Sequence, residues 1–267
     1  MTTNPAPPSD VPLLLLHGFL GCKDDWHEVA TSLQTGRRVA AFDLPGHGQA
    51  ADAREDGDCS MDATAHRIEA VLEALEAPQG HLIGHSLGAR AALYFAATRP
   101  GCVASLVLES ASAGLPDGAG RDAQRRADEE RMRTLLSRGL EAFVDEWETL
   151  ALLATQKTLP ADVLAAQRAR RLRGDGEAIA RSLRDAGAAA HPWLGEHLAK
   201  IDAPVLLIAG ARDSEHVALA RELKHGLPHA HLEIVPGAGH DVHLEKPQEF
   251  VAIVDEFLGH HAGAHHH

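Results

Sequence analysis

The chain has 267 residues, of which 45% are hydrophobic and only 4% aromatic, and its formal net charge is -13 at pH 7. This length suits one large α/β domain with an insertion and is too short for two independent domains of ordinary size. The acidic balance argues against nucleic acids and anionic membrane surfaces as partners.

The chain opens with residues 1–10, which we expect to form a flexible leader without the basic and apolar blocks of a signal peptide. No run of the sequence approaches the length of a membrane span. Three cysteines, Cys22, Cys59 and Cys102, show no metal-binding spacing and cannot all pair. We therefore expect a protein of the reducing cytoplasm, with no metal site and no cofactor. Residues 259–267 are predicted to form a second flexible tail, whose histidines resemble a purification tag.

Six apolar runs are predicted to be strands, at 11–17, 38–43, 80–84, 103–109, 204–209 and 231–235. Helical patterns follow at 24–34, 61–75, 87–98, 214–226 and 247–258. This alternation predicts an α/β fold with a mostly parallel, doubly wound sheet, formed by residues 11–111 and 198–258. Residues 112–197 break the rhythm, because they hold no convincing strand. We interpret them as an inserted helical cap over the carboxyl edge of the sheet, where ligands bind in such folds.

The third predicted strand ends in the most informative motif of the chain, Gly84-His85-Ser86-Leu87-Gly88. Gly-x-Ser-x-Gly between a strand and a helix is the pattern of a nucleophile elbow. The turn is so tight that the residues two before and two after the serine must lack clashing side chains. The hydroxyl of Ser86 would then stand clear of the backbone, beside a helix N-terminus that stabilises developing negative charge.

An acid and a histidine follow the serine in the order typical of α/β-hydrolases. Asp213 comes just after the fifth predicted strand, and His240 just after the sixth. In this scheme His240 accepts the proton of Ser86, and Asp213 fixes the tautomer of the imidazole and stabilises its charged form. The alternative, three unrelated loop residues on another doubly wound protein, is disfavoured because all three stand at strand ends.

The loop after the first predicted strand, His17-Gly18-Phe19-Leu20-Gly21, completes this constellation. In such folds it supplies one backbone N–H of the oxyanion hole, here from Phe19, while Leu87 supplies the other. His17 could be a second base, but we expect it to brace the loop by hydrogen bonding.

Arg90 lies one helical turn after Ser86. A cation near a helix N-terminus opposes the macrodipole, so an anion should lie close by. Two anions are possible: Glu109, in a structural ion pair, or a carboxylate of the substrate. The predicted cap is rich in arginine, and most of these side chains are expected to be solvated. Trp147 could belong to the core of the cap or, as we favour in a chain so poor in aromatics, to the pocket wall.

Several segments resemble the 2-succinyl-6-hydroxy-2,4-cyclohexadiene-1-carboxylate synthases of menaquinone biosynthesis, members of the α/β-hydrolase superfamily. The resemblance covers nearly the whole chain after residue 11. Motifs shared with many esterases are His17-Gly18-Phe19 and the run from Asp43 to Gly48. The more specific features are Arg90, the Arg-rich helix that begins near Arg121, and the run from Arg181 to Gly187.

The resemblance implies a lyase reaction, in which proton abstraction from a cyclohexene ring triggers elimination of pyruvate from an enolpyruvyl ether. Ser86 and His240 would act as a proton relay instead of forming an acyl-enzyme. The substrate would be a small polycarboxylate. The residues expected to bind it are Arg90, Arg125, Arg126 and Arg171, together with Trp147 of the expected pocket wall.

The sequence departs from the family pattern at three positions. His85 replaces a tyrosine, Ala89 replaces a glycine, and Gln124 stands where the family often has an arginine. Two other functions remain open. A carboxylesterase acting through an acyl-enzyme would prefer an apolar acyl pocket, whereas the lyase needs several cations. A ligand receptor without catalysis would have less need of an intact Ser-His-Asp set. The sequence does not indicate an oligomeric state.

Overall fold

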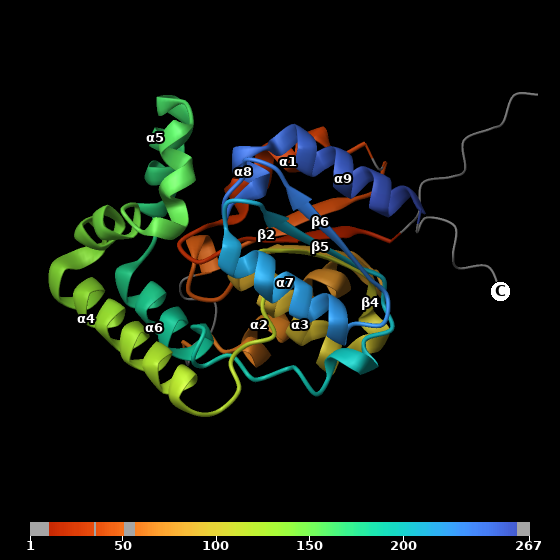
Figure 1. Ribbon diagram of the computed structural model, residues 1–267, viewed down its shortest axis with the longest axis horizontal. Helices are drawn as coiled ribbons and strands as arrows, with labels where there is room; N and C mark the ends of the chain where they lie inside the picture. Colours follow the sequence, from red (N-terminus) through yellow and green to blue (C-terminus); the bar gives the residue numbers. More distant parts are fainter. Residues whose placement is uncertain (1–10, 35, 51–56, 261–267) are drawn as a thin grey trace, which may run out of the picture.

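The computed structural model describes residues 11–34, 36–50 and 57–260, and Figure 1 shows how their elements are arranged. These residues form one six-stranded sheet in the order β2-β1-β3-β4-β5-β6, and every pair of neighbouring strands is parallel. The strands are β1 (Leu13–Leu16), β2 (Val39–Phe42), β3 (Gly80–His85), β4 (Val103–Glu109), β5 (Val205–Gly210) and β6 (Ala230–Val235). All six predicted strands are therefore present.

Helices cover both faces of the sheet (Figure 1). One face carries α2 (Met61–Ala74), α3 (Leu87–Thr98) and α7 (Ser214–Gly226), and the other carries α1 (His27–Ser32), α8 (Val242–Glu245) and α9 (Pro247–His260). The alternation of side chains along β1 explains this division, because Leu14 and Leu16 join the core on the first face, whereas Leu13 and Leu15 join the core on the second. A strand buried on both faces is apolar throughout, as the parallel sheet requires.

Two predicted helices differ from those observed. The helix expected over 24–34 is a short 3-10 helix η1 (Lys23–Trp26) followed by the six residues of α1. The Asp25 carboxylate accepts the Cys22 N–H at 2.8 Å, which holds this tighter turn. At the other end α9 runs to His260, so residues 259 and 260 belong to a helix and not to the predicted tail. The leader at 1–10 and the rest of the tail, 261–267, lie outside the described residues.

Every secondary-structure element of the insertion between β4 and β5, within the described residues, is a helix. The insertion contains α4 (Ala119–Trp147), η4 (Ala151–Thr158), α5 (Ala161–Arg171), α6 (Gly176–Ala186) and η5 (Leu198–Lys200). The longest helix, α4, is interrupted at Gly139, where φ is 83°. The insertion has a small apolar core of its own, in which Leu135, Phe143 and Ile179 pack together with Leu20 from the loop after β1. This shared core fixes the insertion against the body of the molecule.

The order of the strands in the sheet explains where the candidate site lies. The chain leaves β1 for β2 on one side and then crosses to β3 on the other, so β1 and β3 are neighbours whose following loops diverge. A crevice at the carboxyl ends of strands forms at such a switch point. The loop containing Phe19 and the turn containing Ser86 both lie there. Among the described helices none is both long and apolar enough to cross a membrane.

Candidate active site

Ser86 occupies a strained turn between β3 and α3. Its backbone has φ 50° and ψ -106°, a left-handed conformation that a residue with a side chain rarely adopts. The turn needs glycine on both sides. A Cβ added to Gly84 would lie 2.4 Å from the carbonyl oxygen of Gly88, and one added to Gly88 would lie 2.2 Å from that of Leu16. These clashes confirm the prediction that the residues two before and two after Ser86 must lack side chains.

Asp213 and His240 form the acid–base pair expected at the ends of β5 and β6. Nδ1 of His240 lies 2.8 Å from Oδ2 of Asp213, and both side chains are buried. Burial alone would raise the pKa of Asp213, but hydrogen bonds from His216 and His240 outweigh it and hold that pKa well below its usual range. Because Asp213 stays ionised, His240 donates through Nδ1 and keeps Nε2 as the basic nitrogen.

A second histidine shares the same carboxylate. His216, in the first turn of α7, donates its backbone N–H to Asp213 Oδ1 at 3.1 Å, and its Nδ1 lies 2.8 Å from Oδ2. Its ring stands 4.5 Å, centre to centre, from that of His240. The sequence analysis missed this residue, although its position three residues after Asp213 at a helix start is a recognisable capping signal.

The loop after β1 is braced by His17, as predicted. Its Nδ1–H donates to the Gly18 carbonyl at 2.8 Å, and its Nε2 accepts the Leu44 N–H at 3.0 Å. Both ring nitrogens are therefore used, which leaves none for catalysis. The first turn of α3 lies against the start of this loop, because a Cβ added to Gly88 would meet the carbonyl oxygens of Leu16 and His17. The N–H of Leu87, the first residue of α3, has no partner within its own helix.

Other residues position the loop of His240. The hydroxyl of Ser110 donates to the carbonyl of His240 at 2.7 Å, and the carboxylate of Glu245 accepts the Gly239 N–H at 2.8 Å. Ser110 itself has φ 51° at the end of β4. A polar residue directly after a central strand was the available sequence signal for Ser110.

Glu109 is the partner of His243 and not of Arg90. Its buried carboxylate accepts the backbone N–H of His243 at 3.0 Å and lies 2.9 Å from Nδ1 of the same residue. Burial alone would lower the pKa of His243, but the Glu109 carboxylate outweighs it and raises the pKa to about 9. The structural ion pair that the sequence offered for Arg90 is therefore wrong, because Glu109 is already neutralised by a protonated histidine.

Arg90 turns instead toward the insertion. Its Nη1 donates to the carbonyl of Ala186, at the end of α6, at 3.1 Å. Burial lowers the pKa of Arg90 to about 10, while the charge of Asp128 acts in the opposite direction. Within the described part of the chain no carboxylate oxygen stands within 4.0 Å of its guanidinium nitrogens. A partly buried cation whose hydrogen-bond partner is a carbonyl can still accept an anion.

The structure separates the other candidate substrate residues. The Trp147 ring packs 5.1 Å from that of Phe19, centre to centre, so this residue joins α4 to the loop after β1. Arg171 is buried and pairs with Glu148 at 3.0 Å. Arg125 pairs with Asp122 on α4, where both side chains are about half exposed, and Arg126 is also exposed. Gln124 donates to Asp128 at 2.8 Å.

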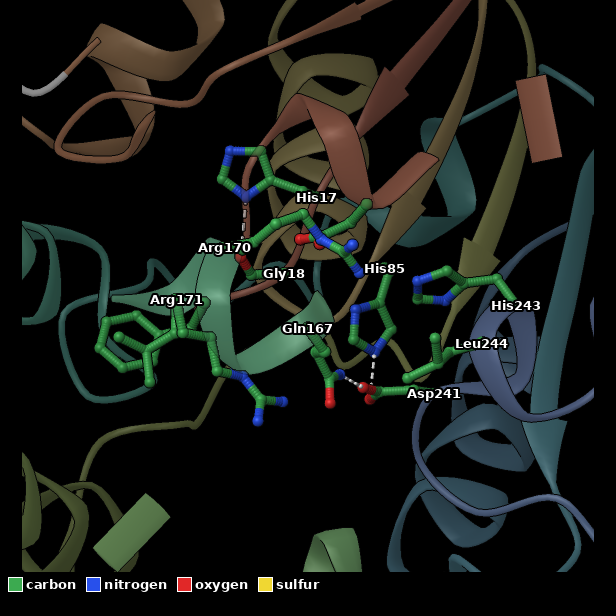
Figure 2. A pocket seen from close by; sticks show the side chains of 13 residues that line it. His17, Gly18, His85, Gln167, Arg170, Arg171, Asp241, His243 and Leu244 are labelled. Carbon is green, nitrogen blue, oxygen red and sulfur yellow. Dashed lines mark hydrogen bonds and ion pairs between the residues drawn. The ribbon is translucent and has the colours of Figure 1, made fainter. Parts of the chain in front are cut away.

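A small cavity of about 40 Å³ lies between the loop after β1 and α5. Figure 2 shows His85, Asp241 and Gln167 on its wall, with Arg170 and Arg171 from α5 nearby. Nε2 of His85 is 3.1 Å from Oδ1 of Asp241, and the amide of Gln156 donates to Oδ2 of the same aspartate at 2.7 Å. These groups adjoin His240, whose ring stands 5.1 Å from that of His85.

Comparison with known proteins gives a consistent result. A sequence model described as the alpha/beta hydrolase fold matches residues 11–247. A putative 2-succinyl-6-hydroxy-2,4-cyclohexadiene-1-carboxylate synthase of Bacillus subtilis (strain 168) is 37% identical, over 92% of this chain and 89% of that protein. The enzyme of that name from Serratia proteamaculans (strain 568) is 30% identical, over 92% of each chain. The solved structure of MenH from S. aureus superposes with a TM-score of 0.90 at 30% identity and covers 96% of each chain.

Proposed function

The chain belongs to the 2-succinyl-6-hydroxy-2,4-cyclohexadiene-1-carboxylate synthase family, within the α/β-hydrolase fold, and from this premise we propose that it eliminates pyruvate from an enolpyruvyl cyclohexene carboxylate. Its substrate is then a small polycarboxylate, and no cofactor takes part. The relatives are named for this synthase activity. Free cysteines at positions 22, 59 and 102 agree with a cytoplasmic location.

In this proposal Ser86, His240 and Asp213 form a proton relay. Nε2 of His240 accepts the hydroxyl proton of Ser86, and the serine oxygen removes a proton from the ring. The electron pair of that C–H bond forms a ring double bond, and the C–O bond to the enolpyruvyl group breaks. The released enolpyruvate takes up a proton and becomes pyruvate. The backbone N–H groups of Phe19 and Leu87 stabilise the negative charge that develops during proton abstraction.

The observation that carries the proposal is the environment of Arg90. The side chain is one turn from Ser86, it is partly buried, and the carboxylate that could have neutralised it, Glu109, is paired with His243. A partly buried cation with no carboxylate oxygen within 4.0 Å, in the described part of the chain, favours an anionic ligand. A substrate carboxylate fills this role, whereas a neutral ester does not. The insertion, which contacts Arg90 through Ala186, would close over the bound substrate as a cap.

The alternative is a carboxylesterase, because the Ser86 elbow and the Asp213–His240 pair would equally serve acyl transfer. The two functions are distinguished by measuring pyruvate release from the enolpyruvyl substrate and hydrolysis of p-nitrophenyl acetate with the same preparations. For Arg90→Ala we expect a loss of roughly 2–4 kcal/mol of transition-state stabilisation in the lyase assay and a much smaller change in ester hydrolysis.

Arg90→Lys is the matched control for this experiment. Lysine keeps the charge but loses the planar fork, so we expect lyase activity between those of the wild type and of Arg90→Ala. Melting temperatures of all three proteins show whether the loss of the hydrogen bond to Ala186 disturbs the fold. Equal losses in both assays, together with a lower melting temperature, would show that Arg90 has a structural role and would favour the esterase.

A further inference from the structure

Three side chains beside the proposed relay have the arrangement of a metal site. His85, His240 and Asp241 each offer one ligand atom, these atoms all lie within 4.8 Å of one another, and all three residues are buried. Figure 2 shows His85 and Asp241 facing each other across the wall of the small cavity. Imidazole nitrogen and carboxylate oxygen are the ligands that zinc takes in open, three-residue sites.

Two of these atoms, Nε2 of His85 and Oδ1 of Asp241, form an ion pair at 3.1 Å, and the two side chains are only 9% exposed. In the described part of the chain, neither atom has a hydrogen bond to a third group. Buried polar atoms of this kind are rare and costly. The separation is close to that of two ligand atoms in a tetrahedral site, about 3.3 Å for metal–ligand bonds of about 2.0 Å.

The surrounding hydrogen bonds already orient the ligands. Asp213 holds Nδ1 of His240, which leaves the opposite ring nitrogen available. The amide of Gln156 holds Oδ2 of Asp241 at 2.7 Å and leaves Oδ1 available. A carboxylate behind a histidine ligand, and a hydrogen bond behind a carboxylate ligand, are the supports that metal sites in proteins commonly have.

The local charge also favours a dication. Three buried carboxylates lie within this cluster, those of Glu109, Asp213 and Asp241. Buried carboxylates are stabilised by pairing with cations or by coordinating a metal ion. Arg170 and Arg171, across the cavity, are matched by their own partners, Asp25 and Glu148.

We propose that His85, His240 and Asp241 bind a divalent transition-metal ion of the zinc type, which reversibly inhibits the enzyme. The ion would occupy the nitrogen of His240 that otherwise accepts the serine proton, and so would stop the relay. The cavity of about 40 Å³ beside His85 and Asp241 provides space for a bound water in the fourth position. Magnesium and calcium prefer oxygen ligands in larger number and would not compete.

A second set of residues could compete for the metal, and the experiment must distinguish it. Asp213, His216 and His240 also lie within 4.8 Å of one another. In that set, however, Oδ2 of Asp213 already bonds Nδ1 of His240, so a metal ion there would have to break this hydrogen bond. His216→Phe removes a ligand from the second set alone, and Asp241→Asn alters a ligand of the proposed site alone. His85 also belongs to a third set, with Glu109 and His243, so His85→Phe is interpreted together with Asp241→Asn.

The test uses the full chain with His261, His265, His266 and His267 changed to Ser, so that the histidine-rich tail does not bind metal. Co²⁺ is added and its visible absorption is recorded, because a tetrahedral site with nitrogen ligands gives an intense band without any substrate. We expect one equivalent to bind to this protein and to His216→Phe, and affinity at least about tenfold weaker in His85→Phe and in Asp241→Asn.

Inhibition is measured in the same proteins with Zn²⁺, each relative to its own metal-free activity. We expect activity to fall with added Zn²⁺, to return with EDTA, and to be at least about tenfold less sensitive in His85→Phe. Binding unchanged in His85→Phe, binding lost in His216→Phe, or no tetrahedral Co²⁺ spectrum at all would each overturn the site. Because the spectrum requires no substrate, this result is independent of whether the proposed lyase reaction is correct.

Discussion

At the scale of single residues, the site depends on where each buried charge finds its partner. Glu109 neutralises His243, Asp213 serves two histidines, and Arg90 is left with the carbonyl of Ala186. These pairings matter because a charge that is removed from water is stabilised only by a partner in contact with it. Arg90 and the His240 ring that Asp213 orients are the two groups on which the proposed elimination from a carboxylate substrate depends.

The role of Ser86 is tested by two substitutions at the same position. Ser86→Ala should lower turnover by at least ~100-fold, because the relay loses the atom that removes the substrate proton. Ser86→Gly should be equally inactive, and it should be at least as stable as Ser86→Ala because glycine adopts the left-handed conformation without strain. Steady-state kinetics and thermal unfolding measure both effects. Near-normal turnover in either variant would rule out the catalytic role of the serine.

At the scale of elements, the site is assembled from loops and helix starts at one edge of a parallel sheet. α3 begins directly after Ser86, and α7 begins directly after Asp213, whose side chain caps it. In the insertion, α6 is the helix whose end accepts the hydrogen bond from Arg90, and it packs Ile179, Ala180 and Leu183 inward. The stability of α6 therefore bears on the position of Arg90.

The cap of α6 offers a test of this dependence. The carboxylate of Asp175 accepts the Ala178 N–H at 2.7 Å and satisfies one of the free N–H groups at the helix start. Asp175→Ala should lower the free energy of unfolding by about 1 kcal/mol, whereas Asp175→Asn, which preserves a capping oxygen, should cost much less. Urea denaturation followed by circular dichroism gives both values. Equal losses in the two variants would mean that the cap does not stabilise the helix.

At the scale of the whole molecule, the buried ion pair of Glu109 and His243 joins β4 to the segment that follows His240. The folded-state pKa of His243, about 9, is higher than the ordinary value of 6.5. The folded protein therefore holds this proton more tightly than the unfolded chain does. The resulting stabilisation is fully present below pH 6.5 and is lost as the pH rises through about 9.

Glu109→Gln should remove this pH dependence. Without the carboxylate, burial keeps His243 neutral, so the variant should be less stable than the wild type at pH 6 by roughly 1–3 kcal/mol. The difference should narrow as the pH rises from 6.5 to about 9, because the wild type loses its own proton over that range. Chemical denaturation across this range checks the expectation. A constant difference at every pH would show that His243 is not the titrating group.

The sequence by itself determined the elements and the chain order of the proposed relay. Apolar runs, helical periodicity and glycines at the elbow are local signals, and all six strands lie within two residues of their predicted bounds. The reason is that local backbone sterics and the burial of a central strand on both faces are already encoded in neighbouring residues. For this reason the sequence was enough to predict that Ser86, Asp213 and His240 each follow the end of a strand.

Only the tertiary structure decided which side chains meet. The sequence analysis offered Glu109 as a partner for Arg90, yet Glu109 pairs with His243, which lies 134 residues away in the chain. The sequence likewise holds no local signal for the ion pair of His85 with Asp241 or for the pairing of Arg171 with Glu148. A buried charged side chain pairs with the group that folding brings into contact with it, and that depends on how strand-end loops converge from distant parts of the chain.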